Sequence, residues 1–254
     1  MHGIAQNDWL APRAVVALVA VCTVVLLAGC RGTSPDSTPT ATVAPGPRSA
    51  PLQGDAPVYR VIAAESLLQI YAYRGGSLSR LGHNHVIAAR NLQGTVMVPS
   101  DPLLTRLDVT IPVALLTVDE PALRAAAGED FSTEVPDSAR AGTRTNMLGP
   151  ALLDADRHPG IGLGLLSLTR VADRYDAEIE VTIKSQRHSV RVPLQVSQTP
   201  AQLSASGEFA LKQSELGLTP FSVMLGALTV QDELRVKFSL VAQRQQLSSA
   251  LTAP

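Results

Sequence analysis

The chain has 254 residues, with 21 basic and 22 acidic side chains and a formal net charge of −1. A net charge so close to zero gives no overall field that would attract nucleic acid or an anionic membrane surface, so we expect no nucleic-acid partner. The length is compatible with one or two domains.

Residues 14–28 form an apolar run without a charged side chain, and Arg13 precedes it. A basic flank, a short apolar core and small residues at its end are typical of a secretory signal. The run is shorter than the roughly 20 residues that a membrane-spanning helix needs. The sequence therefore predicts export from the cytoplasm.

The apolar run ends in Leu-Ala-Gly-Cys, which resembles the lipobox of bacterial lipoproteins. The resemblance implies that residues 1–29 are a lipoprotein signal peptide and that Cys30 carries the lipid, with acyl chains such as palmitate. Two or three acyl chains anchor a protein firmly, because each buried CH₂ contributes about 0.8 kcal/mol. The alternative is an ordinary secretory signal that contains a cysteine.

We expect the protein to lie in the cell envelope, facing the periplasm and bound to the membrane through this anchor. The residue after Cys30 is Arg31, not the aspartate that commonly retains lipoproteins at an inner membrane, which favours an outer membrane where one exists. The other cysteine, Cys22, lies within the predicted signal, so no disulfide framework is expected.

Residues 30–56 are rich in Pro, Ser, Thr, Ala and Gly. Such a segment buries too little apolar surface to offset its ordering entropy, so we predict a disordered tether after the lipidated cysteine. One folded domain is expected at 57–245, and a disordered tail at 246–254.

Apolar and polar residues alternate in several segments of this domain, which is the pattern of a strand with one buried face. The clearest strands are predicted at 107–111, 175–183, 190–196 and 234–240. Further strands are predicted at 58–63, 67–74, 81–90, 92–98, 161–171 and 202–212. Two short helices are expected at 121–127 and 136–148, each beginning at a proline. Consecutive strands of this kind indicate an all-β fold, either a sandwich or an up-and-down barrel.

Four segments, in order, resemble the YceI-like family of polyisoprenoid-binding bacterial proteins. They are YRVIAAESLLQIYAY at 59–73, LGHNHVI at 81–87, LLDADRHPGI at 152–161 and IKSQRHSVRV at 183–192. The fourth departs from the family pattern, because Ser185-Gln186-Arg187 stands where members commonly have a glycine. The resemblance implies an antiparallel lipocalin-like β-barrel with one or two short inserted helices, whose interior holds a polyisoprenoid or a similar amphiphilic lipid.

Such a protein is a binder or carrier and not an enzyme, and no cofactor is expected. An apolar tube removes the cost of exposing a long tail to water, about 0.8 kcal/mol per CH₂. The candidate ligand-binding residues are Tyr71, Tyr73, His83, Asn84, His85, His158, Ile179, Val181, Val236 and Phe238. A filled barrel without a ligand is the alternative, and a homodimer that pairs through exposed strands is possible for this fold.

The H-N-H triplet at 83–85 allows a second hypothesis. On a strand, His83 and His85 would point to the same face, about 7 Å apart, as in zinc and copper sites that also need a third ligand. His158 or His188 would be that ligand in a metal-binding or redox-partner protein. The triplet is not the site of an H-N-H nuclease, whose three residues are not adjacent in sequence. The alternative to a metal site is a polar patch at the barrel mouth that binds the backbone or a ligand head group.

Overall fold

The computed structural model describes residues 56–246. The predicted signal peptide, the lipidation site at Cys30, and almost all of the predicted tether and tail lie outside these residues.

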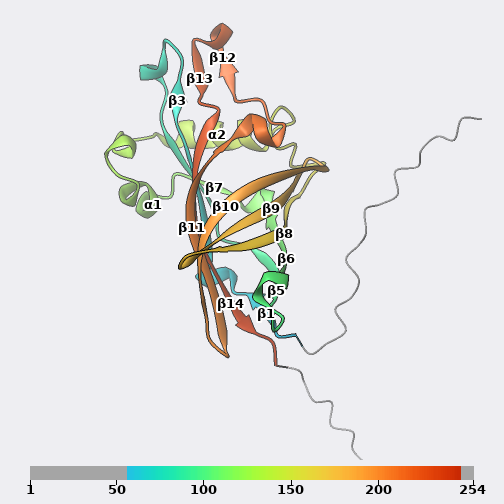
Figure 1. Ribbon diagram of the computed structural model, residues 1–254. Helices are drawn as coiled ribbons and strands as arrows, with labels where there is room; N and C mark the ends of the chain where they lie inside the picture. The colour runs from blue at the N-terminus through green and yellow to red at the C-terminus, as the bar shows by residue number, and fades with distance from the viewer. Residues whose placement is uncertain (1–55, 247–254) are drawn as a thin grey trace, which may run out of the picture. The chain divides into compact units, whose positions relative to one another are not determined.

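Eight antiparallel strands form a closed ring (Figure 1). In ring order they are β1 (Val58–Val61), β5 (Gln93–Met97), β6 (Arg106–Pro112), β8 (Gly160–Val171), β9 (Arg174–Ile183), β10 (Gln186–Gln198), β11 (Gln202–Lys212) and β14 (Glu233–Arg244). The last strand pairs with the first, so that Tyr59 lies opposite Arg244. The predicted lipocalin-like barrel is therefore confirmed.

Bent chain segments add a lateral extension to the ring. β1 continues through a 3₁₀ turn, η1 (Ala63–Glu65), into β2 (Leu67–Ala72). β14 pairs with β1 near one end and with β2 near the other. β2 pairs with β4 (His85–Ala89), which pairs with β7 (Thr117–Val118), and η4 (Val113–Leu115) connects β6 to β7.

β10 and β11 are paired along only part of their length, from Gln195↔Ser206 to Gln198↔Leu203. The pairing stops beside Pro193, because a proline has no backbone N–H to donate. Gly207 follows on β11, where a Cβ would lie 2.3 Å from the Pro193 carbonyl oxygen. Above this point a 3₁₀ turn, η6 (Gln213–Leu216), contacts both strands and buries Leu216.

The two ends of the barrel differ. The upper end in Figure 1 carries α1 (Pro121–Ala126), η5 (Glu129–Phe131), α2 (Asp137–Leu148), η2 (Ser79–Leu81) and η7 (Met224–Gly226). It also carries a small sheet of β3 (Arg74–Gly75), β13 (Leu228–Val230) and β12 (Ser222–Val223). The lower end carries η3 (Pro102–Leu104), the β10–β11 turn, the start of β1 and the end of β14. The β8–β9 turn belongs to the same end of the ring, although it lies at mid-height in Figure 1. Within residues 56–246, no helix combines the length and hydrophobicity needed to cross a membrane.

Most predicted strands and both predicted helices are present, although several boundaries differ, and two of these differences concern candidate site residues. The strand predicted at 81–90 begins only at His85, because the Gly82 carbonyl and the Asn84 side chain accept hydrogen bonds from Arg74 and do not join the backbone ladder of a sheet. The strand predicted at 67–74 ends at Ala72, and β3 belongs to the small sheet. β7, β12 and β13 were not predicted, since two or three residues are too few to show alternation.

Candidate ligand-binding cavity

The barrel encloses a cavity of about 370 Å³, within the range of about 300–1,000 Å³ typical of small-molecule sites. Most of its lining residues are Leu, Ile, Val, Ala and Phe from seven of the eight ring strands, all except β1, and from β2. None of the lining residues is charged. The polar lining residues are Thr105, Tyr175 and Gln198. The interior surface is therefore apolar, with polar groups at only these three positions.

The two-residue period of β9 shows how the sequence builds this wall. Ala177, Ile179 and Val181 line the cavity. Glu178 and Glu180 point the other way: Glu178 accepts a hydrogen bond of 2.6 Å from the Ser189 hydroxyl on β10, on the outer face. Alternation thus separates an apolar interior from a charged exterior.

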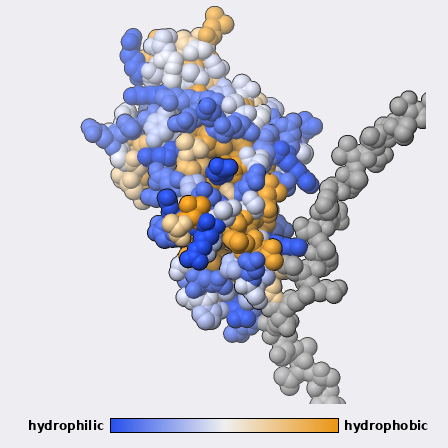
Figure 2. Space-filling view, viewed as in Figure 1, coloured by the Kyte–Doolittle hydropathy of each residue, from blue (hydrophilic) through white to orange (hydrophobic). Residues whose placement is uncertain are grey.

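The cavity reaches solvent at the lower end. Its exposed lining residues are Pro102 before β6, and Val196 and Gln198 at the end of β10. At the upper end the lining residues Ile183 and Leu216 are buried. Figure 2 shows hydrophobic surface across the middle of the face that it presents. We refer to the opening beside Pro102, Val196 and Gln198 as the mouth.

Four of the residues proposed from sequence line this cavity: Ile179, Val181, Val236 and Phe238. Two others lie outside it. Tyr71 and Tyr73 are on the outer face of the β2 extension, where each ring centroid is 5.5 Å from that of Phe131. They pack with Val86 and Phe131 in a small second core.

The H-N-H triplet lies at the upper end, opposite the mouth. The His85 Nδ1 atom is 2.6 Å from Asp119 Oδ2, and its Nε2 atom is 3.2 Å from the Thr143 hydroxyl on α2. Asp119 is 1% exposed, and its Oδ1 atom accepts hydrogen bonds from the Val86 amide and from Arg124. Both ring nitrogens of His85 therefore have protein partners.

These partners set the protonation of Asp119. Burial alone would raise the pKa of the Asp119 carboxyl. Hydrogen bonds from His85 and the Val86 amide, together with the charges of His85 and Arg124, outweigh burial and hold that pKa below its ordinary value. The carboxylate therefore stays ionised as the centre of a buried network.

Asn84 also has a structural position. Its Oδ1 atom accepts a hydrogen bond of 2.9 Å from the Arg74 amide, and its Nδ2 atom donates to the Asp130 carbonyl. Its own carbonyl accepts a hydrogen bond of 2.6 Å from Arg124. Asn84 thus connects the start of β4 with β3, α1 and η5.

His83 is half-buried, and its ring centroid is 6.2 Å from that of His85. Burial lowers the pKa of His83, and the positive charges of His85, Arg124 and Arg74 lower it further. Within residues 56–246 no group of three or more His, Cys, Asp or Glu side chains is placed to hold a metal ion. The third ligand that the metal hypothesis requires is thus missing from the described part of the chain.

The other two histidines of residues 56–246 lie near η6 and the β9–β10 turn. The His158 Nδ1 atom is 3.3 Å from the Ser185 hydroxyl, and its Nε2 atom is 3.9 Å from Asp154. The His188 Nε2 atom is buried without a hydrogen-bond partner, close to the position that a Cβ on Gly217 would occupy. Neither histidine lines the cavity.

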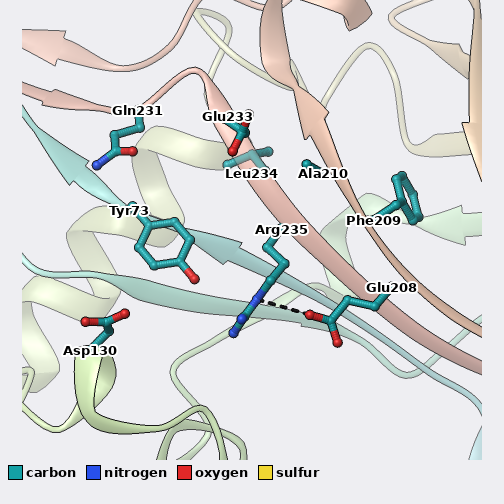
Figure 3. Close-up of a pocket in the computed structure, with 9 residues that line it drawn as sticks. All are labelled: Tyr73, Asp130, Glu208, Phe209, Ala210, Gln231, Glu233, Leu234 and Arg235. Carbon is teal, nitrogen blue, oxygen red and sulfur yellow. Dashed lines mark ion pairs between the residues drawn. The ribbon is translucent and has the colours of Figure 1, made fainter.

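A second hollow, of about 510 Å³, lies on the outer face of β11 and β14 (Figure 3). Arg235 crosses it, with its Nε atom 3.5 Å from Glu208 and its guanidinium 4.5 Å from the Tyr71 ring centroid. Tyr73 and Asp130 face the same space in Figure 3. Its charged walls do not suit an apolar ligand.

The central role of Asp119 and Arg124 was not predicted from the sequence. Nothing local identifies Asp119, since His85 is 34 positions away. The one local signal is spacing: Arg124 follows Asp119 by five residues across the start of α1, and the two side chains pair at 2.9 Å.

Comparison with known proteins places this geometry among similar folds. Residues 59–242 match the YceI-like domain. The crystal structure of BcnA from Burkholderia cenocepacia is 20% identical, with a TM-score of 0.53, and the alignment covers 72% of this chain and 99% of that one. A YCEI protein of Campylobacter jejuni is 10% identical, with a TM-score of 0.45, and 63% of this chain and 85% of that one are covered. The comparison with curated proteins found no match.

Proposed function

Because this chain belongs to the YceI-like family, we propose that its barrel binds a polyisoprenoid or a similar amphiphilic lipid and carries it within the cell envelope. The protein acts in this proposal as a binder or carrier and not as an enzyme. The observation that supports it most directly is the cavity, whose wall has no charged side chain. Each CH₂ of a ligand that enters gains about 0.8 kcal/mol.

The distribution of polar groups suggests how an amphiphile would be oriented. Thr105 and Gln198 lie at the lower end of the cavity, where Gln198 is exposed, and Tyr175 is the second residue of β9. The apolar tail would occupy the interior, and the head group would remain at the mouth, in contact with these groups and with water. This orientation keeps the head group in water, because burying it would leave its polar atoms without hydrogen-bond partners, at a cost in free energy.

The predicted lipid anchor at Cys30 completes the proposal. An anchored barrel stays close to the membrane that contains its ligand, which raises the effective concentration of the ligand at the mouth. The histidine-based metal site is not proposed, since the structural partners of His85 leave neither ring nitrogen free.

A matched pair of substitutions tests ligand binding. Ala205 and Ala210 are both on β11, but Ala205 lines the cavity and Ala210 lines the outer hollow. The full-length protein would be purified in mild detergent and extracted with organic solvent, and the extract measured by mass spectrometry. We expect about one bound amphiphile per chain, reduced at least about fivefold in Ala205→Trp and unchanged in Ala210→Trp. A wild-type extract without a stoichiometric amphiphile would indicate a filled barrel and reject the proposal.

A further inference from the structure

Five large apolar side chains are exposed at the lower end of the barrel, and we call them the apolar rim. They are Leu103 (47% exposed), Leu104 (57%), Leu166 (54%), Val171 (42%) and Val196 (37%). Scattered apolar residues on a surface need no explanation, but a group of them beside a cavity marks an interaction site.

The apolar rim is continuous with the cavity. Leu103 and Leu104 are on η3, which contacts β8, the strand that carries Leu166 and Val171. Val196 is exposed and also lines the cavity, and Pro102 does the same immediately before Leu103. A molecule leaving the cavity at this end therefore meets apolar surface.

The described chain also begins and ends beside the apolar rim. Val58 at the start of β1 lies opposite Met97, near the end of β5 from which the chain runs into η3. Arg244 at the end of β14 lies opposite Tyr59. The predicted lipidation site, Cys30, precedes Ala56 by 26 residues. A stretch of that length reaches at most about 90 Å when fully extended, so an anchor there keeps the barrel near the membrane and is attached at the end that carries the rim.

Local charge agrees with a membrane partner. The segments 56–60, 98–106, 166–176, 195–202 and 242–246 contain five arginines and three aspartates, although the chain as a whole has a net charge of −1. A basic residue near an anionic bilayer surface is attracted to it within about a Debye length.

We propose that the apolar rim docks on the lipid bilayer with the mouth facing the acyl chains. The ligand then passes between bilayer and cavity without exposing its tail to water. This route of entry rests on the proposed function, whereas docking itself does not. The partner that covers the rim is the surface of the bilayer that holds the predicted lipid anchor.

The upper end provides an internal control. Met224 and Leu225, on η7, are 64% and 109% exposed, which makes them at least as available as any residue of the apolar rim. They are on the small sheet at the opposite end of the barrel and do not line the cavity. If exposure of apolar side chains alone decided membrane contact, this tip would dock instead.

Tryptophan quenching distinguishes the two ends. Trp9 is the only tryptophan of the chain. Full-length Trp9→Phe protein therefore has no tryptophan fluorescence, whether or not the predicted signal has been removed. Leu104→Trp and Leu225→Trp would be added separately, and the protein reconstituted into phosphatidylcholine–phosphatidylglycerol vesicles with brominated acyl chains. We expect Leu104→Trp emission to be quenched at least about threefold more than Leu225→Trp emission. Equal quenching, or stronger quenching of Leu225→Trp, would overturn the docking proposal.

A transfer assay tests the route of entry, with dansyl-farnesol in donor vesicles as the probe. The triple variant Leu103→Ser, Leu104→Ser and Leu166→Ser should take up the probe at least about fivefold more slowly, and bind the same amount at equilibrium. Met224→Ser with Leu225→Ser should change neither quantity. Uptake by the triple variant at the wild-type rate would refute entry through the rim. If neither the wild type nor any variant binds the probe, entry through the rim is refuted for isoprenoid alcohols of this kind. The quenching experiment still decides whether the rim docks on the bilayer.

Discussion

Asp119 holds His85 by a contact of 2.6 Å between its Oδ2 atom and the His85 Nδ1 atom, across 34 positions of sequence. Its second oxygen accepts hydrogen bonds from the Val86 amide and from Arg124. One carboxylate therefore joins the upper end of β4 to α1. Asp119 itself has a φ of 54°, a left-handed conformation that aspartate adopts more readily than most residues.

The first prediction follows from this network. Asp119→Asn leaves the Arg124 guanidinium, whose side chain is 11% exposed, without its carboxylate partner, and weakens the contact with His85. We expect a loss of about 3 kcal/mol in the free energy of unfolding, as for other buried pairs that lose one member. Urea denaturation of both proteins measures this difference.

Glu120→Gln is the matched control for that experiment. It makes the same chemical change at the next position, where the ion pair of Glu120 with Arg90 is partly exposed. Exposed pairs contribute about 1 kcal/mol or less, so the control should remain close to wild type. Equal destabilisation by the two variants would contradict the central role of Asp119.

The second prediction concerns pH. Since the folded state lowers the pKa of His83, the unfolded chain binds more protons below about pH 6.5, and the free energy of unfolding falls as pH falls through this range. Asp119 also has a lowered pKa in the folded state, so its contribution is present above about pH 4 and is lost in stronger acid. Stability measured from pH 8 to pH 3 should decrease in two steps.

His83→Asn separates these two steps. It removes the titrating imidazole, so the dependence between pH 7 and pH 5 should become shallower, while the loss below pH 4 remains. An unchanged slope between pH 7 and pH 5 would show that another group titrates there.

The third prediction uses two glycines of opposite character. Gly207 lies where a Cβ would be 2.3 Å from the Pro193 carbonyl oxygen and 2.8 Å from the Phe238 ring, so Gly207→Ala must displace backbone. We expect a loss of about 1–3 kcal/mol in stability. Gly142, within α2, has no atom within 4 Å of that position, and Gly142→Ala should gain about 0.5–1 kcal/mol from helix propensity. Thermal or urea unfolding that shifted both variants in the same direction would refute this assignment.

The fourth prediction concerns the turn between β9 and β10. Lys184 and Ser185 have φ values of 49° and 63°, so both central residues of a two-residue hairpin are left-handed. Asn-Gly is the preferred pair for such a turn. The double variant Lys184→Asn with Ser185→Gly should gain about 1 kcal/mol, despite losing the contact of Ser185 with His158. An unchanged midpoint in urea would indicate that this contact matters as much as the turn conformation.

Much of the fold could be predicted from sequence, because strand alternation is a local property. The pattern at 175–183 predicted both a strand and its inward residues, and the structure shows Ile179 and Val181 in the cavity wall. Pro121 and Pro136 likewise marked the starts of α1 and α2. The short strands β7, β12 and β13 had no such signal. They are strands because their backbones pair with β4, with each other or with β3, and not because their residues alternate.

The sequence by itself determined which residues alternate, and hence that the interior would be apolar and the outer face charged. It also indicated the family, through the order of four segments. Only the tertiary structure decided the environment of the H-N-H triplet, which lies at the end of the barrel opposite the mouth. The partners of that triplet, Asp119 and Thr143, come from segments 34 and 58 positions away from His85. Strand period is set between neighbouring residues, whereas the contacts of a side chain at the end of a strand depend on which distant segments fold over it.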